Sequence, residues 1–243
     1  MSALGNIVIL TGAGISAESG LQTFRAADGL WEGHRVEDVA TPEAFARNPA
    51  LVHQFYDARR VRLGEVEPNA AHVALARLDA EWRGKLLIVT QNVDDLHERA
   101  GAKRLLHMHG ELRRGWCLAC DERFEWDGPM SPYSARPELR TNGNICPACG
   151  VSGSVRPDIV WFGEMPYDME AIEGALFHAD LFVSIGTSGA VYPAAGFVQT
   201  ARHRGARTLE INLEPSQGSI YFDERRYGRA SEEVSKWVAE ILA

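Results

Sequence analysis

NIVILTGAGISAESGLQTFR, residues 6–25, is the stretch that most strongly indicates the fold of this chain. Its apolar run from Ile7 to Leu10 is typical of a buried parallel strand. The run ends in a glycine turn, where Gly12 permits a tight turn and Gly14 permits close approach of the backbone to a phosphate. A strand, turn and helix start of this kind predicts a dinucleotide site. The same pattern also fits a simple turn, so it does not decide by itself.

The usual dinucleotide fingerprint includes an acidic residue at the end of a second strand, about 20 residues later. In this chain Asp28 and Glu32 follow no strand pattern. The sequence therefore indicates either an unusual mode of nucleotide binding or a protein other than an ordinary dehydrogenase.

Composition excludes several classes of protein. With 243 residues, of which 45% are hydrophobic and 24% charged, the chain can form one domain or a large and a small one. The formal net charge of -8 and the lack of a Lys/Arg-rich patch argue against a nucleic-acid partner. No apolar run is long enough to cross a bilayer, and the first ten residues do not resemble a signal peptide. We therefore expect a cytoplasmic protein without a membrane partner. We also expect it to be a monomer.

Strands alternate with helices along most of the chain. We expect strands at 7–10, 86–90, 105–108, 159–162, 181–185 and 208–211. We expect helices from Thr41-Pro42 onward, around 51–59, and at 68–82, 95–100, 169–178, 194–204 and 231–242, with a long loop at 23–37. Alternation with short connections predicts an α/β fold with a doubly wound, parallel, Rossmann-like sheet. Residues 113–155 interrupt this pattern with Cys, Gly, Pro and Asn, which indicates an inserted module.

Four cysteines form two CxxC pairs, Cys117/Cys120 and Cys146/Cys149. Their number and spacing predict a closed, tetrahedral, structural zinc site, because four thiolates leave no open position for catalysis. The alternative is a set of free buried thiols. In a reducing compartment a metal site is favoured over disulfides.

Polar residues follow two of the expected strands. Gln91 to Asp95 follow the strand at 86–90, and His109 to Glu111 follow the strand at 105–108. Ligands of open α/β sheets bind at the carboxyl ends of the strands. The pKa of histidine suits a general base, so His109 is a candidate catalytic residue. For His107, two positions earlier, a structural role is favoured.

Tyr56 and Arg59 lie three residues apart on one expected helix face. A guanidinium and a phenol that converge on one point make a good receptor for a carboxylate. The alternative is a solvated Arg59 beside Arg60, with Tyr56 as a packing residue.

Together these residues resemble the sirtuins, a family of NAD-dependent protein lysine deacylases, over essentially the whole chain. The matching blocks are GAGISAESG (12–20), TFR (23–25), QNVDDLH (91–97), HGE (109–111), the four cysteines, PDIVWFGE (157–164), GTS (186–188) and INLE (211–214). The family usually has Ile where this chain has Val93. Val93 is smaller than that Ile by one methylene, a difference that leaves the resemblance intact.

The resemblance implies a Rossmann-like NAD-binding domain formed by 1–35, 71–112 and 156–243. A helical insertion, 36–70, and the zinc-binding insertion, 113–155, would form the small domain. NAD would be consumed as a co-substrate: the acyl oxygen attacks C1′ of the nicotinamide ribose, nicotinamide leaves, and His109 acts as general base on the ribose hydroxyls. The products would be free lysine and O-acyl-ADP-ribose. An orientation of NAD unlike that in dehydrogenases would explain the missing acidic residue.

The resemblance also implies roles for individual residues. Asn92 and Asp94 would position the nicotinamide and its ribose, Phe24 would shield the reacting face, and Arg25 would order the lid. The implied NAD-binding residues are Gly12, Ala13, Gly14, Ser16, Ala17, Glu18, Phe24, Arg25, Trp31, Gln91, Asn92, Val93, Asp94, Gly186, Thr187, Ser188, Asn212, Leu213, Glu214 and Ala230. The implied substrate-binding residues are Ala40, Tyr56, Arg59, Trp161, Phe162, Gly163, Glu164, Val191 and Tyr192.

Tyr56 and Arg59 resemble the Tyr-x-x-Arg of class III sirtuins, which accept succinyl and malonyl lysine, and Ala40 falls where that class keeps a small residue. Succinyl and malonyl groups are thus the expected acyl substrates, acetyl is also expected, and acylated-lysine proteins are the expected partners. Two alternatives are an NAD-dependent protein ADP-ribosyltransferase and a non-catalytic module that senses NAD or ADP-ribose. A dehydrogenase is disfavoured.

Overall fold

The computed structural model describes residues 5–22, 30–31, 33–130 and 144–243, with the side chains of Leu30 and Trp31 left out. Outside the described residues lie two of the expected NAD-binding residues, Phe24 and Arg25, and most of the loop expected at 23–37. The side chain of Trp31, also expected to bind NAD, is not described either.

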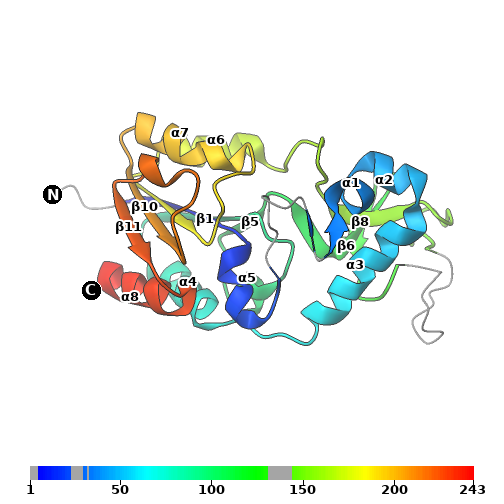
Figure 1. Cartoon of the computed structure of the whole chain (residues 1–243), viewed down its shortest axis with the longest axis horizontal. Coiled ribbons are helices and arrows are strands. Elements are labelled where there is room, and N and C mark those ends of the chain that lie inside the picture. The colour runs from blue at the N-terminus through cyan, green and yellow to red at the C-terminus, as the bar shows by residue number, and fades with distance from the viewer. Residues whose placement is uncertain (1–4, 23–29, 32, 131–143) are drawn as a thin grey trace.

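A six-stranded parallel sheet forms the centre of the larger domain (Figure 1), in the order β11-β10-β9-β1-β4-β5. Its strands are β1 (Asn6–Thr11), β4 (Lys85–Thr90), β5 (Leu105–His107), β9 (Leu181–Ile185), β10 (Arg207–Asn212) and β11 (Glu224–Tyr227). The chain builds the sheet outward from β1 first toward β5 and then, from β9, toward β11. The direction therefore reverses between β1 and β9, where ligands of doubly wound sheets bind. The predicted fold class is confirmed.

Helices cover both faces of this sheet (Figure 1). On one face lie α4 (Ala70–Glu81) and α8 (Ala230–Leu242), and on the other lie α6 (Met169–Phe177) and α7 (Phe197–His203). Successive side chains of β1 point to opposite faces of the sheet. Ile9 packs in the core formed with α4 and α8, and Val8 packs in the core formed with α6 and α7. Both faces are buried, which explains the uninterrupted apolar run in the sequence.

The small domain combines helices with a three-stranded antiparallel sheet. The sheet has the order β7-β6-β8, formed by β6 (Gly110–Cys117), β7 (Arg123–Glu125) and β8 (Val155–Ile159). Beside it lie α1 (Val36–Val39), α2 (Pro42–Arg47) and α3 (Pro49–Leu63), and the short hairpin β2 (Leu30–Trp31) and β3 (His34–Arg35). Thr41 caps α2 as predicted, since its Oγ1 accepts from the Ala44 amide at 3.0 Å.

Two expectations need correction. The strand expected at 159–162 lies earlier, at β8, and pairs antiparallel with β6. Its charged residues Arg156 and Asp158 are buried because they have ionic partners, so hydrophobicity gave no signal. The helix expected after Gly14 consists of two 3₁₀ turns, η1 (Ala13–Ile15) and η2 (Ala17–Ser19).

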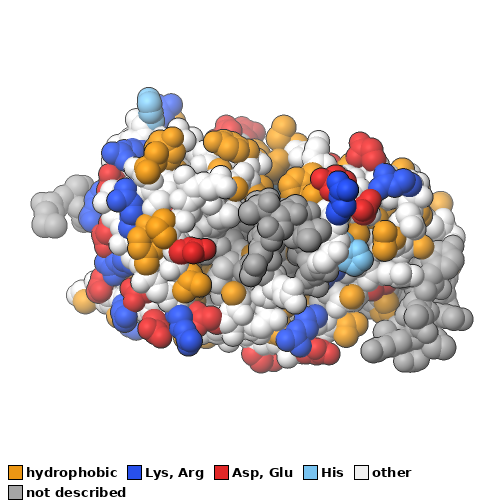
Figure 2. All heavy atoms as spheres, in the orientation of Figure 1, with side chains coloured by type: hydrophobic (Ala, Val, Ile, Leu, Met, Phe, Trp, Pro, Cys, Tyr) orange, Lys and Arg blue, Asp and Glu red, His pale blue; other side chains and the backbone are white. Residues whose placement is uncertain are grey.

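The remaining short elements complete the described chain. They are α5 (Leu96–Arg99), which agrees with the helix expected at 95–100, and the 3₁₀ turns η4 (Ala194–Gly196), which leads into α7, and η5 (Ser219–Tyr221). Among the described residues, none of the helices has both the length and the apolar character that crossing a membrane requires. Acidic and basic side chains are interspersed over the visible face (Figure 2).

The turn after β9 generates a prediction about stability. Gly186 has φ +63°, and a Cβ there would lie 2.5 Å from the Ile15 nitrogen. Gly205 also has a positive φ, +86°, but no described atom lies within 4 Å of its Cβ position. The conformational cost alone is about 1–2 kcal/mol. Gly186→Ala should therefore lower the free energy of unfolding clearly more than Gly205→Ala, measured by urea denaturation. Equal losses would contradict the close contact.

Candidate active site

The glycine turn after β1 interlocks with the turn after β9. The Gly12 amide donates to the Ile185 carbonyl at 3.0 Å, and the Gly14 amide donates to the Gly186 carbonyl at 2.9 Å. A Cβ on Gly14 would lie 2.7 Å from Gly186 Cα. The sequence suggested approach to a phosphate as the reason for these glycines. The structure shows that close approach of two backbone segments already requires them.

A buried polar network lies beside this turn. The Ser16 hydroxyl donates to Asp94 Oδ2 at 3.0 Å and accepts from Asn92 Nδ2 at 3.2 Å. His72 Nδ1 accepts from the Asn69 amide, so its Nε2 carries the hydrogen that faces Ser16 Oγ at 3.4 Å. Burial lowers the pKa of His72 to about 4 and raises that of Asp94 to about 6. The network thus joins three of the predicted site residues to His72, whose sequence signal was only its place on an amphipathic helix.

His109 lies at the same edge of the sheet. Its Nδ1 is 3.0 Å from the Gln91 carbonyl oxygen, which can only accept, so Nδ1 carries the hydrogen. Burial lowers the pKa of His109, although this hydrogen bond opposes the shift. The ring is therefore neutral near pH 7, and Nε2 has a lone pair. A fixed tautomer of this kind suits a general base.

His107 differs from His109 in its partners. Its Nδ1 donates to the Asn92 carbonyl at 3.1 Å, and Nε2 is 2.6 Å from Glu98 Oε1. Burial opposes protonation, but the Glu98 carboxylate outweighs it and raises the pKa of His107. This ion pair agrees with the structural role favoured from the sequence.

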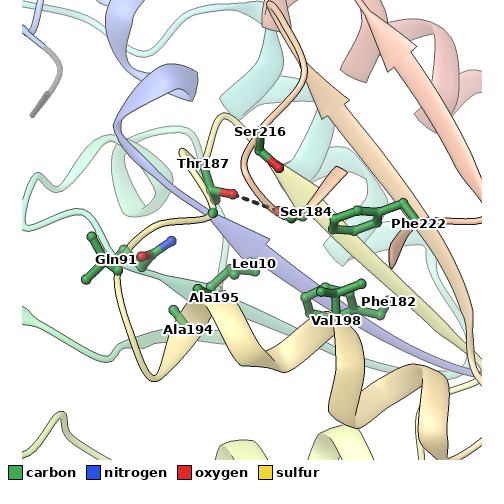
Figure 3. A pocket seen from close by; sticks show the side chains of 13 residues that line it. Leu10, Gln91, Phe182, Ser184, Thr187, Ala194, Ala195, Val198, Ser216 and Phe222 are labelled. Carbon is green, nitrogen blue, oxygen red and sulfur yellow. Dashed lines mark hydrogen bonds between the residues drawn. The ribbon is translucent and has the colours of Figure 1, made fainter. Parts of the chain in front are cut away.

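A pocket lies next to the turn after β9 (Figure 3). Its lining includes Gln91, Ser184, Thr187, Ser216 and Phe222, with Ser184 Oγ 2.9 Å from Thr187 Oγ1. Ser184 and Ser216 were not among the predicted residues. They come from a strand interior and a distant loop, and no linear motif links them.

The segment expected to contact adenosine gathers around the ends of β9 and β10. Asn212 Nδ2 donates to the Thr187 carbonyl at 2.8 Å, and Leu213 is 71% exposed. Glu18, expected to bind NAD, accepts from the Ser231 amide at 2.9 Å and from its hydroxyl at 2.6 Å. This carboxylate therefore caps α8, next to Ala230.

Three of the expected substrate-binding residues occupy the core of the small domain. Ala40, Tyr56 and Trp161 belong to one buried apolar cluster. The Tyr56 hydroxyl accepts from Trp161 Nε1 at 3.0 Å. The Arg59 guanidinium carbon lies 3.1 Å from the centre of the Phe55 ring, and Arg59 Nη1 donates to the Phe55 carbonyl at 2.5 Å. The side chains of Tyr56 and Arg59 are both buried, which rules out the alternative of a solvated Arg59.

The segment expected to pair with a peptide joins the two domains. The Phe162 amide donates to the Ala40 carbonyl at 3.0 Å, and Gly163 adopts φ +92°. Tyr192, on the other expected segment, is 73% exposed, and Val191 lines the pocket of Figure 3. Glu164 accepts from Arg156, so its carboxylate has an internal partner.

The four cysteines converge at the end of β6. Their sulfurs lie within 4.8 Å of one another, and the Cys117–Cys149 and Cys120–Cys146 Sγ pairs are each 3.8 Å apart. These distances are far too long for disulfides, and all four thiols are free. Tetrahedral zinc with bonds of about 2.3 Å places its sulfurs about 3.8 Å apart. The cluster therefore fits the predicted structural zinc.

Comparison with known proteins places the chain in a family. Residues 12–193 match the model of the Sir2 family. The chain belongs to the Sir2 family. A protein from Bdellovibrio bacteriovorus named NAD-dependent protein deacylase is 58% identical over 98% of this chain and 97% of its own length. A protein of the same name from Vibrio vulnificus is 57% identical over 98% and 94%.

Solved structures agree with this assignment to the Sir2 family. A Sir2 homologue in complex with NAD is 37% identical, has a TM-score of 0.86, and covers 98% of this chain and 91% of its own. The fold of this chain is therefore the Sir2 fold, with its second domain.

In this Sir2-family chain the cysteine module is attached to α3. Asp57 Oδ1 accepts from the Met130 amide at 2.7 Å, and Asn144 Nδ2 donates to His53 Nε2 at 3.0 Å. Burial lowers the pKa of His53 to about 4, so its neutral ring can accept. Disturbance of the module should therefore reach the helix that contains Tyr56 and Arg59.

Metal removal tests this attachment. Because small modules with four thiolate ligands depend on their metal for folding, a chelator should expose the amides around Cys117 and Cys146. The amides of α3 should lose protection next, whereas those of β1 should keep it. Hydrogen exchange measured by mass spectrometry reports each segment, with zinc content determined on the same sample. Full protection in metal-free protein would contradict a structural metal.

Proposed function

We propose that this Sir2-family protein is an NAD-dependent protein lysine deacylase that releases nicotinamide and O-acyl-ADP-ribose. The observation that carries the proposal is the state of His109, whose Nδ1–H is held by the Gln91 carbonyl and whose lowered pKa leaves Nε2 unprotonated. This base follows β5 at the carboxyl end of the sheet, and its partner Gln91 directly precedes Asn92 of the network of Ser16, Asn92 and Asp94.

NAD is the proposed co-substrate, and bound NAD supplies a ribose carbon that accepts the acyl oxygen as nicotinamide leaves. Asn92 and Asp94 are proposed to hold the nicotinamide riboside half, since both are fixed by hydrogen bonds before any ligand arrives. Thr187, Ser188 and Asn212 are proposed to hold the adenosine half. His109 takes a proton from a ribose hydroxyl through Nε2, which makes that oxygen nucleophilic.

The protein substrate is proposed to be an acylated lysine in an extended peptide. An extended peptide can add a strand to main chain that is already fixed, and residues 161–164 and 189–192 are proposed to supply it. The net charge of -8 favours a protein over a nucleic acid as partner. We also propose a monomer in the cytoplasm, where thiols remain available as metal ligands. The proposed division follows the domain segments expected from the sequence, except that β6, β8 and the β2–β3 hairpin lie in the small domain.

Succinyl and malonyl groups are the proposed preferred acyl groups. Burial of their carboxylate costs several kcal/mol unless a cation receives it. Arg59 is buried in the small domain three residues after Tyr56, and its charge acts on the Tyr56 phenol. Acetyl lysine remains a substrate, because a pocket for a larger group accepts a smaller one.

His109→Ala provides a direct test of the base. The variant should lose release of deacylated peptide from acyl peptide and NAD by at least about a hundredfold, because the proposed base for the ribose hydroxyl is gone. Calorimetric binding of NAD should change little. Because the pKa of His109 is lowered, the wild-type rate should fall on the acid side with a midpoint below the ordinary histidine value.

Mass spectrometry of the wild-type reaction separates the alternatives. O-acyl-ADP-ribose supports deacylation, ADP-ribose on protein supports transfer to protein, and no nicotinamide release with any acyl peptide supports a sensing module. Full activity of His109→Ala would overturn its role as base.

Arg59→Met tests the carboxylate receptor with a side chain of similar length and no charge. On a panel of acetyl, malonyl and succinyl peptides, kcat/KM should fall at least about tenfold more for the acidic acyl groups than for acetyl, because only these leave an unpaired buried carboxylate. Arg62→Met, an exposed position on the same helix, is the matched control. Equal loss for all three peptides would refute the receptor.

A further inference from the structure

The side chain of Trp161 makes contacts that its proposed main-chain role does not explain. Its side chain is buried, its Nε1–H donates to the Tyr56 hydroxyl at 3.0 Å, and its ring lies at an interplanar angle of 29° to the Tyr56 ring, with the ring centres 6.4 Å apart. On the same indole, the Arg156 guanidinium carbon lies 3.3 Å from the ring centre. The indole is thus held between a cation and a phenol.

The direction of the hydrogen bond fixes the phenol. An indole N–H can only donate, so the Tyr56 oxygen must accept from it. Burial raises the pKa of Tyr56 above its ordinary range, although the charge of Arg59 opposes the shift, so the phenol keeps its proton. With one side of the oxygen engaged by Trp161, the hydroxyl hydrogen is directed to the other side. The indole therefore occupies one of the directions in which the Tyr56 hydroxyl could otherwise donate.

The indole is itself held by an ion pair between the buried Arg156 and the partly exposed Glu164. Arg156 donates to the two Glu164 oxygens at 2.6 and 2.9 Å, and also to the Ile159 carbonyl at 2.7 Å. Glu164 Oε2 accepts from the Trp161 amide at 2.8 Å. A bidentate pair of this kind fixes orientation as well as distance. It closes the turn of residues 161–164 under the indole and limits its rotation.

We propose that Trp161, held by Arg156 and Glu164, is a positioning residue that sets selectivity for acidic acyl groups by directing the Tyr56 hydroxyl toward the acyl carboxylate. This inference rests on the acidic-acyl preference proposed above. Loss of the indole N–H lets the phenol hydrogen point in either direction, which weakens its bond to a carboxylate. An acetyl group has no carboxylate, so turnover of acetyl peptide falls less than turnover of succinyl peptide.

Trp161→Phe removes the N–H and keeps an aromatic ring. The ratio of kcat/KM for succinyl peptide to that for acetyl peptide should fall about tenfold, the size expected for one hydrogen bond to a charged group. Trp82→Phe, which removes an indole N–H bonded to the Gly5 carbonyl in the larger domain, is the matched control and should leave the ratio unchanged. If Trp161→Phe does not fold, Arg156→Lys, which keeps the charge but loses the bidentate pair, should lower the ratio in the same direction.

A double-mutant cycle distinguishes positioning from simple packing. In a Tyr56→Phe background, Trp161→Phe should not lower the ratio further, because the group that it directs is gone. A packing role would lower both activities equally in both backgrounds. A wild-type protein without preference for succinyl peptide would overturn the acidic-acyl proposal and this inference together. A wild-type preference that Trp161→Phe leaves unchanged would overturn this inference alone.

Discussion

The active-site edge depends on the contact between two backbone turns, at residues 12–14 and at Gly186. Each turn follows a central strand, and the amides of Gly12 and Gly14 bond to the carbonyls of Ile185 and Gly186. A single Cβ at either turn would meet backbone atoms that have no room to move. Because Ser16 lies just beyond the first turn, and Thr187 and Ser188 just beyond Gly186, this contact sets the distance between the two proposed halves of the NAD site.

Around that contact, the site is built from polar groups that are buried but satisfied. Ser16 connects Asn92, Asp94 and His72, and the backbone carbonyl of Gln91 selects the tautomer of His109. Burial moves the pKa values of these groups in the directions that favour neutral imidazoles. An unpaired polar group in the same place would cost 1–3 kcal/mol or more, roughly. The arrangement is therefore rigid before any ligand binds, which is what a site for proton transfer requires.

The small domain connects three features that are distant in sequence. The cysteine cluster is attached to α3 through Asp57 and Met130, and α3 contains Tyr56, which accepts from Trp161 on the segment between the domains. Two of the cysteines pack in one buried cluster and Tyr56 with Trp161 in another, and α3 links the two through Asp57. Removal of a structural metal is therefore expected to disturb the proposed acyl pocket as well as the cysteine module.

The sequence by itself determined the parallel sheet, the capped helices, the paired cysteines and the blocks of the Sir2 family, because periodicity, caps and motifs are local signals. It did not locate β8, where Arg156 and Asp158 are buried because Glu164, on the following turn, and Arg123, on β7, neutralise them. Nor did it assign Glu18 to the cap of α8 or bring Ser184 and Ser216 to the pocket. Those features depend on which side chains meet after folding. Even for the opening stretch, the sequence required Gly12 and Gly14, but only the tertiary structure decided that Gly186 is what approaches them.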